Sequence, residues 1–98
     1  MVKSDFIHNE IYYYKSGGLH FNYSYIFQAN LNNKISNDSI GYNNYIDIDS
    51  SYLANGGHNP IGESRLATPK ERAWLLKCIE LNKFIPFDQI PETLIYEL

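Results

Sequence analysis

A glycine-rich stretch in the second half of the chain, GHNPIGES from Gly57 to Ser64, has the spacing of a phosphate-binding loop. In such a loop, backbone amides and one lysine hold the phosphates of a nucleotide, and a helix begins directly afterwards. Here Glu63 stands where the lysine should be, and its carboxylate would repel phosphate. No helix is expected directly after Ser64. We therefore expect this stretch to belong to a surface loop that does not hydrolyse nucleotides.

The stretch DIDSS, which begins with Asp47 and Asp49, is similar to the opening of a calcium-binding loop. A complete loop needs a glycine at its sixth position and a glutamate at its twelfth. These positions hold Tyr52 and His58 instead. We therefore expect the two carboxylates to form a solvated acidic patch, and not a metal site or an acid–base pair.

The remaining reactive side chains do not form a catalytic set either. The three histidines, His8, His20 and His58, lack the spacing of metal ligands, and one cysteine cannot build a zinc site. The cysteine, Cys78, falls within an apolar helical stripe and is expected to be a buried, inert thiol. With no nucleophile and no paired acid and base, the sequence predicts a protein that is not an enzyme and that needs no metal or cofactor.

Tyrosines are the most conspicuous feature, with nine in 98 residues. In a strand the consecutive residues Tyr12, Tyr13 and Tyr14 must point to both faces, so Tyr13 or its two neighbours lie away from the core. Exposed tyrosines beside acids form a credible surface for a partner, because rings add contact area at low entropic cost. The residues predicted to form this partner surface are Tyr12, Tyr14, Tyr42, Tyr45, Asp47 and Asp49. The same pattern also fits aromatic side chains that fill a twisted sheet.

The charge distribution restricts the partner. Residues 1–64 carry three lysines and no arginine against six acids, whereas residues 65–98 carry five basic and five acidic groups. Such a balance disfavours direct binding to nucleic acid, which needs clustered basic residues. It is compatible with docking on a basic protein groove that normally holds nucleic acid.

Alternating side chains predict the strands that position these groups. The clearest strand is LHFNYSYIFQA, with an aromatic face and a polar face. The aromatic face consists of Leu19, Phe21, Tyr23, Tyr25, Phe27 and Ala29. The preceding run EIYYYK and the link SGG complete a hairpin. One or two further short strands are expected in ISNDSIGYNNYIDID, most convincingly at 44–49, where Ile46 and Ile48 face one way and Tyr45, Asp47 and Asp49 the other. Residues 50–64 are expected to form a long loop.

The stretch TPKERAWLLKCIELNKF predicts a helix at about residues 69–82. Thr68 and Glu71 have the spacing of a capping box, Pro69 suits the first helical position, and Asn82 suits the C-cap. The apolar stripe consists of Trp74, Leu75, Cys78, Ile79 and Leu81.

Together these elements predict an α+β fold with one domain over residues 1–98. A small antiparallel sheet of three to five strands should be covered on its aromatic face by the C-terminal helix. The chain has no apolar run of about 18 residues, so no membrane segment is expected. The single cysteine indicates a reducing, cytoplasmic setting.

The segment SRLATPKERAWLLKCIELNKFIPFDQI, preceded by FNYSYIFQA and YIDIDSS, resembles small proteins encoded by bacterial viruses and prophages. Their endings are similar to RLATPEE…WL…CI…NKF-P. Several proteins of this kind belong to the anti-defence class, which includes anti-CRISPR proteins. The resemblance therefore implies a non-catalytic inhibitor in the cytoplasm of a bacterial host, with an RNA-guided nuclease as its protein partner.

Among such nucleases a type VI, RNA-targeting effector is slightly preferred, because a chain rich in Asn, Ile, Lys and Tyr is typical of the low-GC hosts that carry it. The alternatives are a protein that binds a small nucleotide immune signal and an accessory protein of virion assembly. The sequence leaves the oligomeric state and the contacting face of the sheet open.

Overall fold

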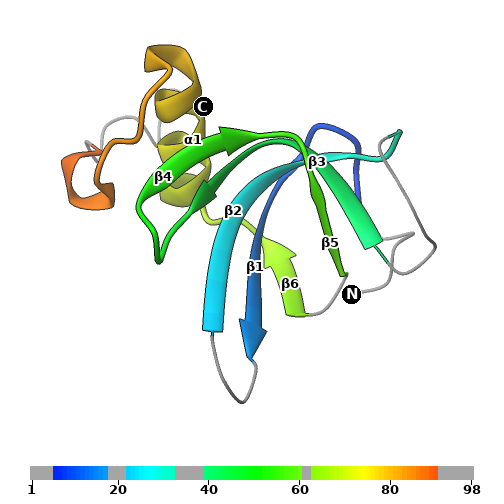
Figure 1. Cartoon of the computed structure of the whole chain (residues 1–98). Helices are drawn as coiled ribbons and strands as arrows, with labels where there is room; N and C mark the ends of the chain where they lie inside the picture. The colour runs from blue at the N-terminus through cyan, green and yellow to red at the C-terminus, as the bar shows by residue number, and fades with distance from the viewer. Residues whose placement is uncertain (1–5, 18–21, 33–38, 61–62, 91–98) are drawn as a thin grey trace.

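The computed structural model describes residues 6–17, 22–32, 39–60 and 63–90, and it confirms the predicted α+β class. The strands are β1 (Ile11–Gly17), β2 (Asn22–Asn30), β3 (Ser39–Asp47), β4 (Tyr52–Asn55), β5 (His58–Pro60) and β6 (Glu63–Leu66), and they are followed by the helix α1 (Pro69–Leu81) and the 3-10 turn η2 (Phe87–Gln89). Figure 1 shows α1 on one side of the sheet, where it packs on β2 and β3.

All the described strands belong to one antiparallel sheet of order β4-β3-β2-β1-β6. The predicted hairpin is confirmed as β1 and β2, with Ile11 opposite Gln28 and Gly17 opposite Asn22. The short strands β4 and β5 pair with the two ends of the same strand, β3, so the sheet is five strands wide. The prediction of a loop over 50–64 is therefore wrong, because this stretch contains β4, β5 and the start of β6.

Two glycines explain why the edge strand is interrupted. Gly56 and Gly57 separate β4 from β5, and both have positive φ angles, of 75° and 126°. Glycine adopts such angles without the steric penalty that a Cβ atom imposes. A register shift between Phe27 and Ala29 bends the sheet at the same level. The edge strand thus follows a bent β3 instead of ending in a loop.

The chain connection between β5 and β6 shows that the sheet is strongly curled. Only residues 61 and 62 separate Pro60 from Glu63, so their Cα atoms are at most about 11 Å apart. In a flat sheet the four strand spacings between β5 and β6 would separate them by about 19 Å. The sheet must therefore bend its two edges towards each other, as Figure 1 shows.

The helix α1 has the predicted ends. The hydroxyl of Thr68 accepts a hydrogen bond from the Glu71 amide, the Glu71 carboxylate accepts one from the Thr68 amide, and Asn82 is the C-cap with φ of 54°. Arg65 pairs with both carboxylate oxygens of Glu71, at 2.7 and 3.0 Å. Burial acts to raise the pKa of Glu71, but the hydrogen bonds from Arg65 and Thr68 outweigh it and hold that pKa below its ordinary value.

The helix covers the face of the sheet opposite to the predicted one. Trp74, Leu75 and Cys78 pack with Ile26 and Ile46, and all five side chains are buried. The aromatic face with Tyr25 and Phe27 points away from α1, so the prediction that the helix lies on that face is wrong. The physical reason is that an aliphatic row can be sealed completely, whereas tyrosine hydroxyls favour access to water or a polar partner.

The apolar stripe of the helix differs from the prediction at its two ends. Ala73 is buried although it was placed outside the stripe, and Leu81 is 46% exposed although it was placed inside. Leu81 ends the helix, where the chain turns back across α1. The indole of Trp74 donates a hydrogen bond to the Ile85 carbonyl at 2.6 Å and lies edge-on to Phe87. The segment after the helix thus completes the cover that the helix alone does not supply.

Candidate functional site: the tyrosine face

The face of the sheet opposite α1 carries a layer of tyrosines, which we call the tyrosine face. Residues that pair directly across antiparallel strands point to the same side of a sheet. One such row runs across four strands through Tyr14, Tyr25, Asp47 and Tyr52. The neighbouring row on the same side runs through Tyr12, Phe27 and Tyr45.

Six tyrosine rings of this face form one connected network. Its members are Tyr14, Tyr23, Tyr25, Tyr42, Tyr45 and Tyr52. The closest pair is Tyr42 and Tyr45, whose ring centroids are 4.8 Å apart in an edge-on arrangement. Tyr25 lies 5.1 Å from Tyr45, and Tyr45 continues the network to Tyr52 at 6.3 Å. Aromatic pairs at these distances favour each other beyond the area that they bury.

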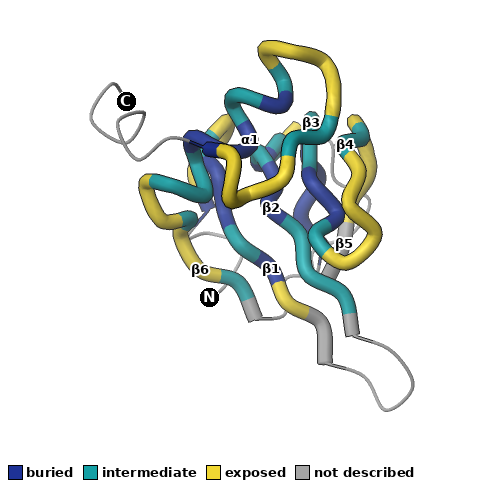
Figure 2. Tube along the Cα trace, turned by 90° about the vertical axis from the view of Figure 1, so that its left-hand side faces the viewer, coloured by how far each residue is buried: buried dark blue, intermediate teal, exposed yellow. Residues whose placement is uncertain are grey.

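The network is graded from buried to exposed. Tyr14 and Tyr42 are 3% and 5% exposed, Tyr25 and Tyr45 are half-buried, and Tyr52 at the β4 edge is 41% exposed. Figure 2 shows the same gradient, with buried positions in the central strands and exposed ones along the edge strand of β4 and β5. The outer end of the network is therefore the part that a partner can reach.

Five of the six residues predicted as a partner surface lie together on this face: Tyr12, Tyr14, Tyr42, Tyr45 and Asp47. Their predicted exposure is wrong for four of them, because Tyr12, Tyr14, Tyr42 and Asp47 are buried. The curl of the sheet and the segment around Phe6, which packs on Tyr12 and Phe27, account for this burial.

The sixth predicted residue, Asp49, lies in the turn that follows β3 and is exposed. Its Oδ2 atom accepts a hydrogen bond of 2.7 Å from the Ser24 amide of β2. This bond holds the Asp49 carboxylate against the backbone of β2, two residues beyond Asp47. The structure therefore brings Asp49 to the rim of the tyrosine face.

The sequence-based prediction of the site missed Tyr23, Tyr25 and Tyr52. The alternation in β2 placed Tyr23 and Tyr25 on the aromatic face correctly, but that face was expected to lie under the helix. Tyr52 was assigned to a loop, where no face could be defined. The pairing of the hairpin, which puts Tyr14 opposite Tyr25, is the signal that could have found Tyr23 and Tyr25. Tyr52 pairs with Asp47 of β3, and no local pattern predicted that pairing.

Burial raises the pKa values of the tyrosines inside the network. For Tyr42 burial is the largest cause, neighbouring tyrosines add to it, and its pKa rises to about 12. The pKa of Tyr25 is raised by burial and then by the charge of Asp47. The pKa of Tyr45 is raised by burial and by a side-chain hydrogen bond with Tyr52. These phenols are consequently neutral at physiological pH and act as hydrogen-bonding, apolar rings.

A close backbone approach holds Tyr42 in place. Its phenol donates a 3.3 Å hydrogen bond to the His58 carbonyl, and its amide donates one of 2.9 Å to the Gly57 carbonyl. A Cβ atom at Gly57 would lie 2.9 Å from the Tyr42 ring. The backbone at Gly57 therefore lies so close to the Tyr42 ring that there is no room for a larger residue at position 57.

The cationic side chains of the described residues lie elsewhere. They are Lys15, Arg65, Lys70, Arg72, Lys77 and Lys83. Lys15 points to the helix side because it alternates with Tyr14, and Arg65 lies over the Tyr13 ring at 4.2 Å, also on the helix side. The others belong to α1 or to the residues directly after it. The described part of the tyrosine face is therefore aromatic and acidic without a positive charge.

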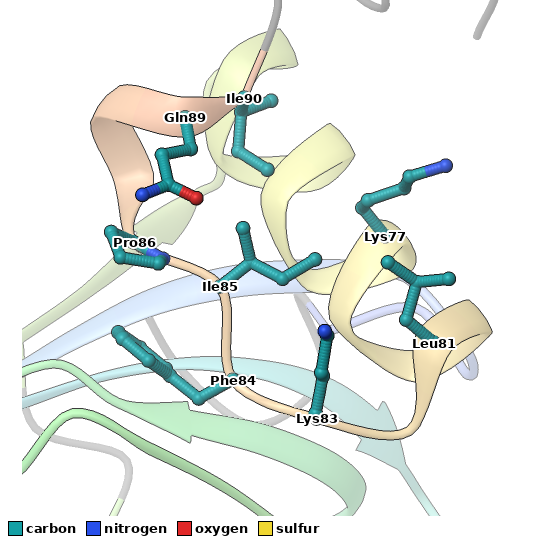
Figure 3. A pocket seen from close by; sticks show the side chains of 8 residues that line it. All are labelled: Lys77, Leu81, Lys83, Phe84, Ile85, Pro86, Gln89 and Ile90. Carbon is teal, nitrogen blue, oxygen red and sulfur yellow. The ribbon is translucent and has the colours of Figure 1, made fainter.

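A shallow groove of about 400 Å³ lies on the other side of the molecule, between the end of α1 and the segment that turns back (Figure 3). Its apolar lining includes Leu81, Ile85 and Ile90, and Lys77 and Lys83 contribute the positive charges. None of the residues predicted as a site from the sequence lines this groove.

The cysteine and the histidines were not predicted to form a site. Cys78 is fully buried between α1 and the sheet, as predicted, and burial raises the pKa of its thiol. His8 accepts a hydrogen bond from the Leu31 amide through Nδ1. Among residues 6–17, 22–32, 39–60 and 63–90, no group of three or more His, Cys, Asp or Glu side chains is placed to hold a metal ion. Within the same residues, no helix has the length and apolar character needed to cross a membrane.

Comparison with known proteins adds no family to this description: no protein-family model matches the chain, and no curated protein or solved structure matches it.

Proposed function

We propose that the chain is a non-catalytic inhibitor of a bacterial defence system, which binds an RNA-guided nuclease through the tyrosine face. The observation that carries the proposal is the connected network of six tyrosines, which α1 leaves uncovered and which ends in the exposed Tyr52. Rigid tyrosine rings at a surface are characteristic of protein contacts.

The charge of the tyrosine face supports a basic protein partner. Asp47 and Asp49 lie at one end of the face, and no described lysine or arginine lies on it. Such a surface repels the phosphate backbone and is attracted to the basic channel in which a nuclease holds its guide or target. An anti-CRISPR protein of this kind competes with nucleic acid for the channel and does no chemistry.

The resemblance of the C-terminal segment to small proteins of bacterial viruses supports the choice of target. It favours an anti-CRISPR protein, with a type VI, RNA-targeting effector as the preferred partner, acting in the cytoplasm of the bacterial host. The arrangement of α1 explains why this segment is a fold element: Thr68 caps the helix, and Trp74 and Cys78 close the helix side of the sheet. The tyrosine face is left available.

The proposal is tested by affinity purification of the tagged chain from bacterial cells that express candidate effectors, followed by a cleavage assay. We expect an RNA-guided nuclease to co-purify, and we expect its activity to fall linearly with added chain until one chain per nuclease is present. Capture should weaken in 0.5 M salt, because exposed charges are screened at that ionic strength.

The same experiment distinguishes the alternatives. Inhibition at far less than one chain per nuclease would indicate turnover and contradict a stoichiometric inhibitor. Capture of no nuclease, together with a small nucleotide released from the purified chain, would favour a protein that binds an immune signal. Self-association without a host partner would favour a role in virion assembly.

A further inference from the structure

The acidic end of the tyrosine face contains a buried carboxylate that is only partly satisfied. Asp47 lies in the row between Tyr25 and Tyr52 and is 7% exposed. Its Oδ1 atom accepts a hydrogen bond of 3.1 Å from the Ser50 amide. Its Oδ2 atom accepts no hydrogen bond from the residues that the structure describes.

A cation would stabilise the Asp47 carboxylate in this buried position. Burying a charged group is unfavourable unless an opposite charge or several hydrogen bonds compensate for it. The described part of the tyrosine face supplies one hydrogen bond to Asp47 and no positive charge. A second carboxylate, that of Asp49, belongs to an exposed residue, and its Oδ2 atom accepts a hydrogen bond from the Ser24 amide.

We propose that this end of the tyrosine face is a receptor for an arginine side chain of a protein partner, whose guanidinium stacks on Tyr52 and Tyr25 and pairs with Asp47 and Asp49. The inference rests on the proposed function in one respect, namely that the tyrosine face contacts a basic protein surface. It goes further by naming the side chain that is recognised and the residues that recognise it.

Arginine fits this site better than lysine for two physical reasons. The guanidinium is planar and weakly hydrated, so it stacks on aromatic rings, whereas an ammonium is a compact and strongly hydrated charge. The guanidinium also presents paired N–H donors, which match the two oxygens of a carboxylate. Tyr52 and Asp47 are paired across β3 and β4, so an exposed ring and a buried carboxylate are neighbours on one face and can offer both contacts.

The test uses two short peptides of equal charge, acetyl-Gly-Arg-Gly-Arg-Gly-amide and acetyl-Gly-Lys-Gly-Lys-Gly-amide. Each is titrated into the full chain and followed by isothermal calorimetry and by amide NMR shifts. We expect the arginine peptide to bind at least about three-fold more tightly, because stacking of a cation on a ring favours arginine. The largest NMR shifts are expected at Tyr25, Asp47 and Tyr52.

Variants locate the binding site. Tyr52→Leu and Asp49→Asn should each weaken binding of the arginine peptide at least about three-fold and reduce its preference over lysine. Lys83→Met, in the groove on the other side, should leave both affinities unchanged. Asp47→Asn should have the largest effect; if it unfolds the chain by circular dichroism, the result for Tyr52→Leu decides.

Equal affinity for the two peptides, no binding of either, or unchanged binding in Tyr52→Leu and Asp49→Asn would each overturn the inference. Its failure is distinct from that of the proposed function. A chain that captures the nuclease but does not distinguish the peptides keeps the function and loses the arginine receptor. A chain that prefers the arginine peptide but captures no nuclease keeps the receptor and loses the proposed target.

Discussion

The two faces of the sheet use neighbouring rows of side chains for different purposes. The row towards α1 runs through Arg65, Tyr13, Ile26, Ile46 and Leu53. The adjacent row lies on the tyrosine face and runs through Ser64, Tyr14, Tyr25, Asp47 and Tyr52. The helix row is aliphatic at its centre and is fully buried at Ile26 and Ile46. The tyrosine row ends in an exposed ring.

The two rows show how a small domain can bury one face of its sheet under a helix and still keep an aromatic surface on the other face. Aliphatic side chains gain stability from complete removal from water, which contributes about 1.5–3 kcal/mol for each fully buried residue. Tyrosine gains from burial of its ring while its hydroxyl prefers a polar environment. Successive residues of a strand point to opposite faces, so the alternation of residues along each strand is enough to separate the aliphatic face from the tyrosine face.

The strongest test of the helix-covered face is Trp74→Ala. The indole is 4% exposed, contacts Phe84 and Phe87, and donates to the Ile85 carbonyl. We expect a loss of about 3–5 kcal/mol in the free energy of unfolding, measured by urea denaturation. A loss of that size is comparable to the whole stability of a small domain, so a large unfolded fraction is expected.

The matched control for Trp74→Ala is Leu81→Ala, at the exposed end of the same helix. This substitution should cost less than about 1 kcal/mol, because surface positions contribute little. Equal losses in the two variants would contradict the view that the indole closes the helix side.

The tyrosine face is tested by Gly57→Ala with Gly56→Ala as its control. Both glycines have positive φ, which costs a residue with a side chain about 1–2 kcal/mol. Only at Gly57 would the added Cβ atom also meet the Tyr42 ring, at 2.9 Å. We expect Gly57→Ala to cost about 1–3 kcal/mol more than Gly56→Ala in urea denaturation. Indistinguishable unfolding curves for the two variants would contradict the close contact between position 57 and the Tyr42 ring.

The capping box contributes a smaller share of the stability on the helix side. Thr68→Ala removes the hydroxyl that accepts the Glu71 amide, at 3.2 Å, and should cost about 1 kcal/mol. Thr68→Ser keeps the acceptor and should remain within a few tenths of a kcal/mol of the native chain. Thermal unfolding followed by circular dichroism at 222 nm measures both variants; a Ser variant as weak as the Ala variant would contradict the role of the hydroxyl.

Alkaline pH tests the tyrosine face through the ionisation of Tyr42. The pKa of Tyr42 is about 12 in the folded chain, above the ordinary value of 10. The unfolded chain therefore loses this proton first as the pH rises. The contribution of Tyr42 to stability is complete below pH 10 and is lost progressively as the pH rises towards 12.

Urea denaturation at pH 8 and pH 11 measures this loss in the native chain and in Tyr42→Phe. The variant cannot ionise at this position, so its stability should fall less between the two pH values. An identical fall in both chains would contradict the buried, neutral state of the Tyr42 phenol.

Local patterns predicted the parts of the fold whose signals lie close together in the sequence. The helix could be predicted with both of its caps, because Thr68, Pro69, Glu71 and Asn82 each have a local mechanism. The hairpin of β1 and β2 could be predicted from two β-rich runs and the link between them. The edge strands could not, because Gly56 and Gly57 interrupt their pattern and their pairing depends on the bend of β3.

The site was predictable in its composition and not in its exposure. The alternation of side chains along the strand predicted that Tyr45 and Asp47 share one face, and the structure confirms this. Which face the helix covers depends on packing between distant segments, which alternation in a single strand does not encode. The burial of Tyr12 and Tyr14 follows from the curl of the whole sheet, so no local pattern reveals it.

The most direct test of the division between the two faces is the affinity of the chain for a purified type VI nuclease, measured by isothermal calorimetry for three chains. These are the native chain, Tyr52→Leu on the tyrosine face, and Lys83→Met in the groove beside α1. The account predicts one-to-one binding that Tyr52→Leu weakens at least three-fold and Lys83→Met leaves unchanged. Weaker binding in Lys83→Met with full binding in Tyr52→Leu would contradict it, as would the absence of binding in the native chain.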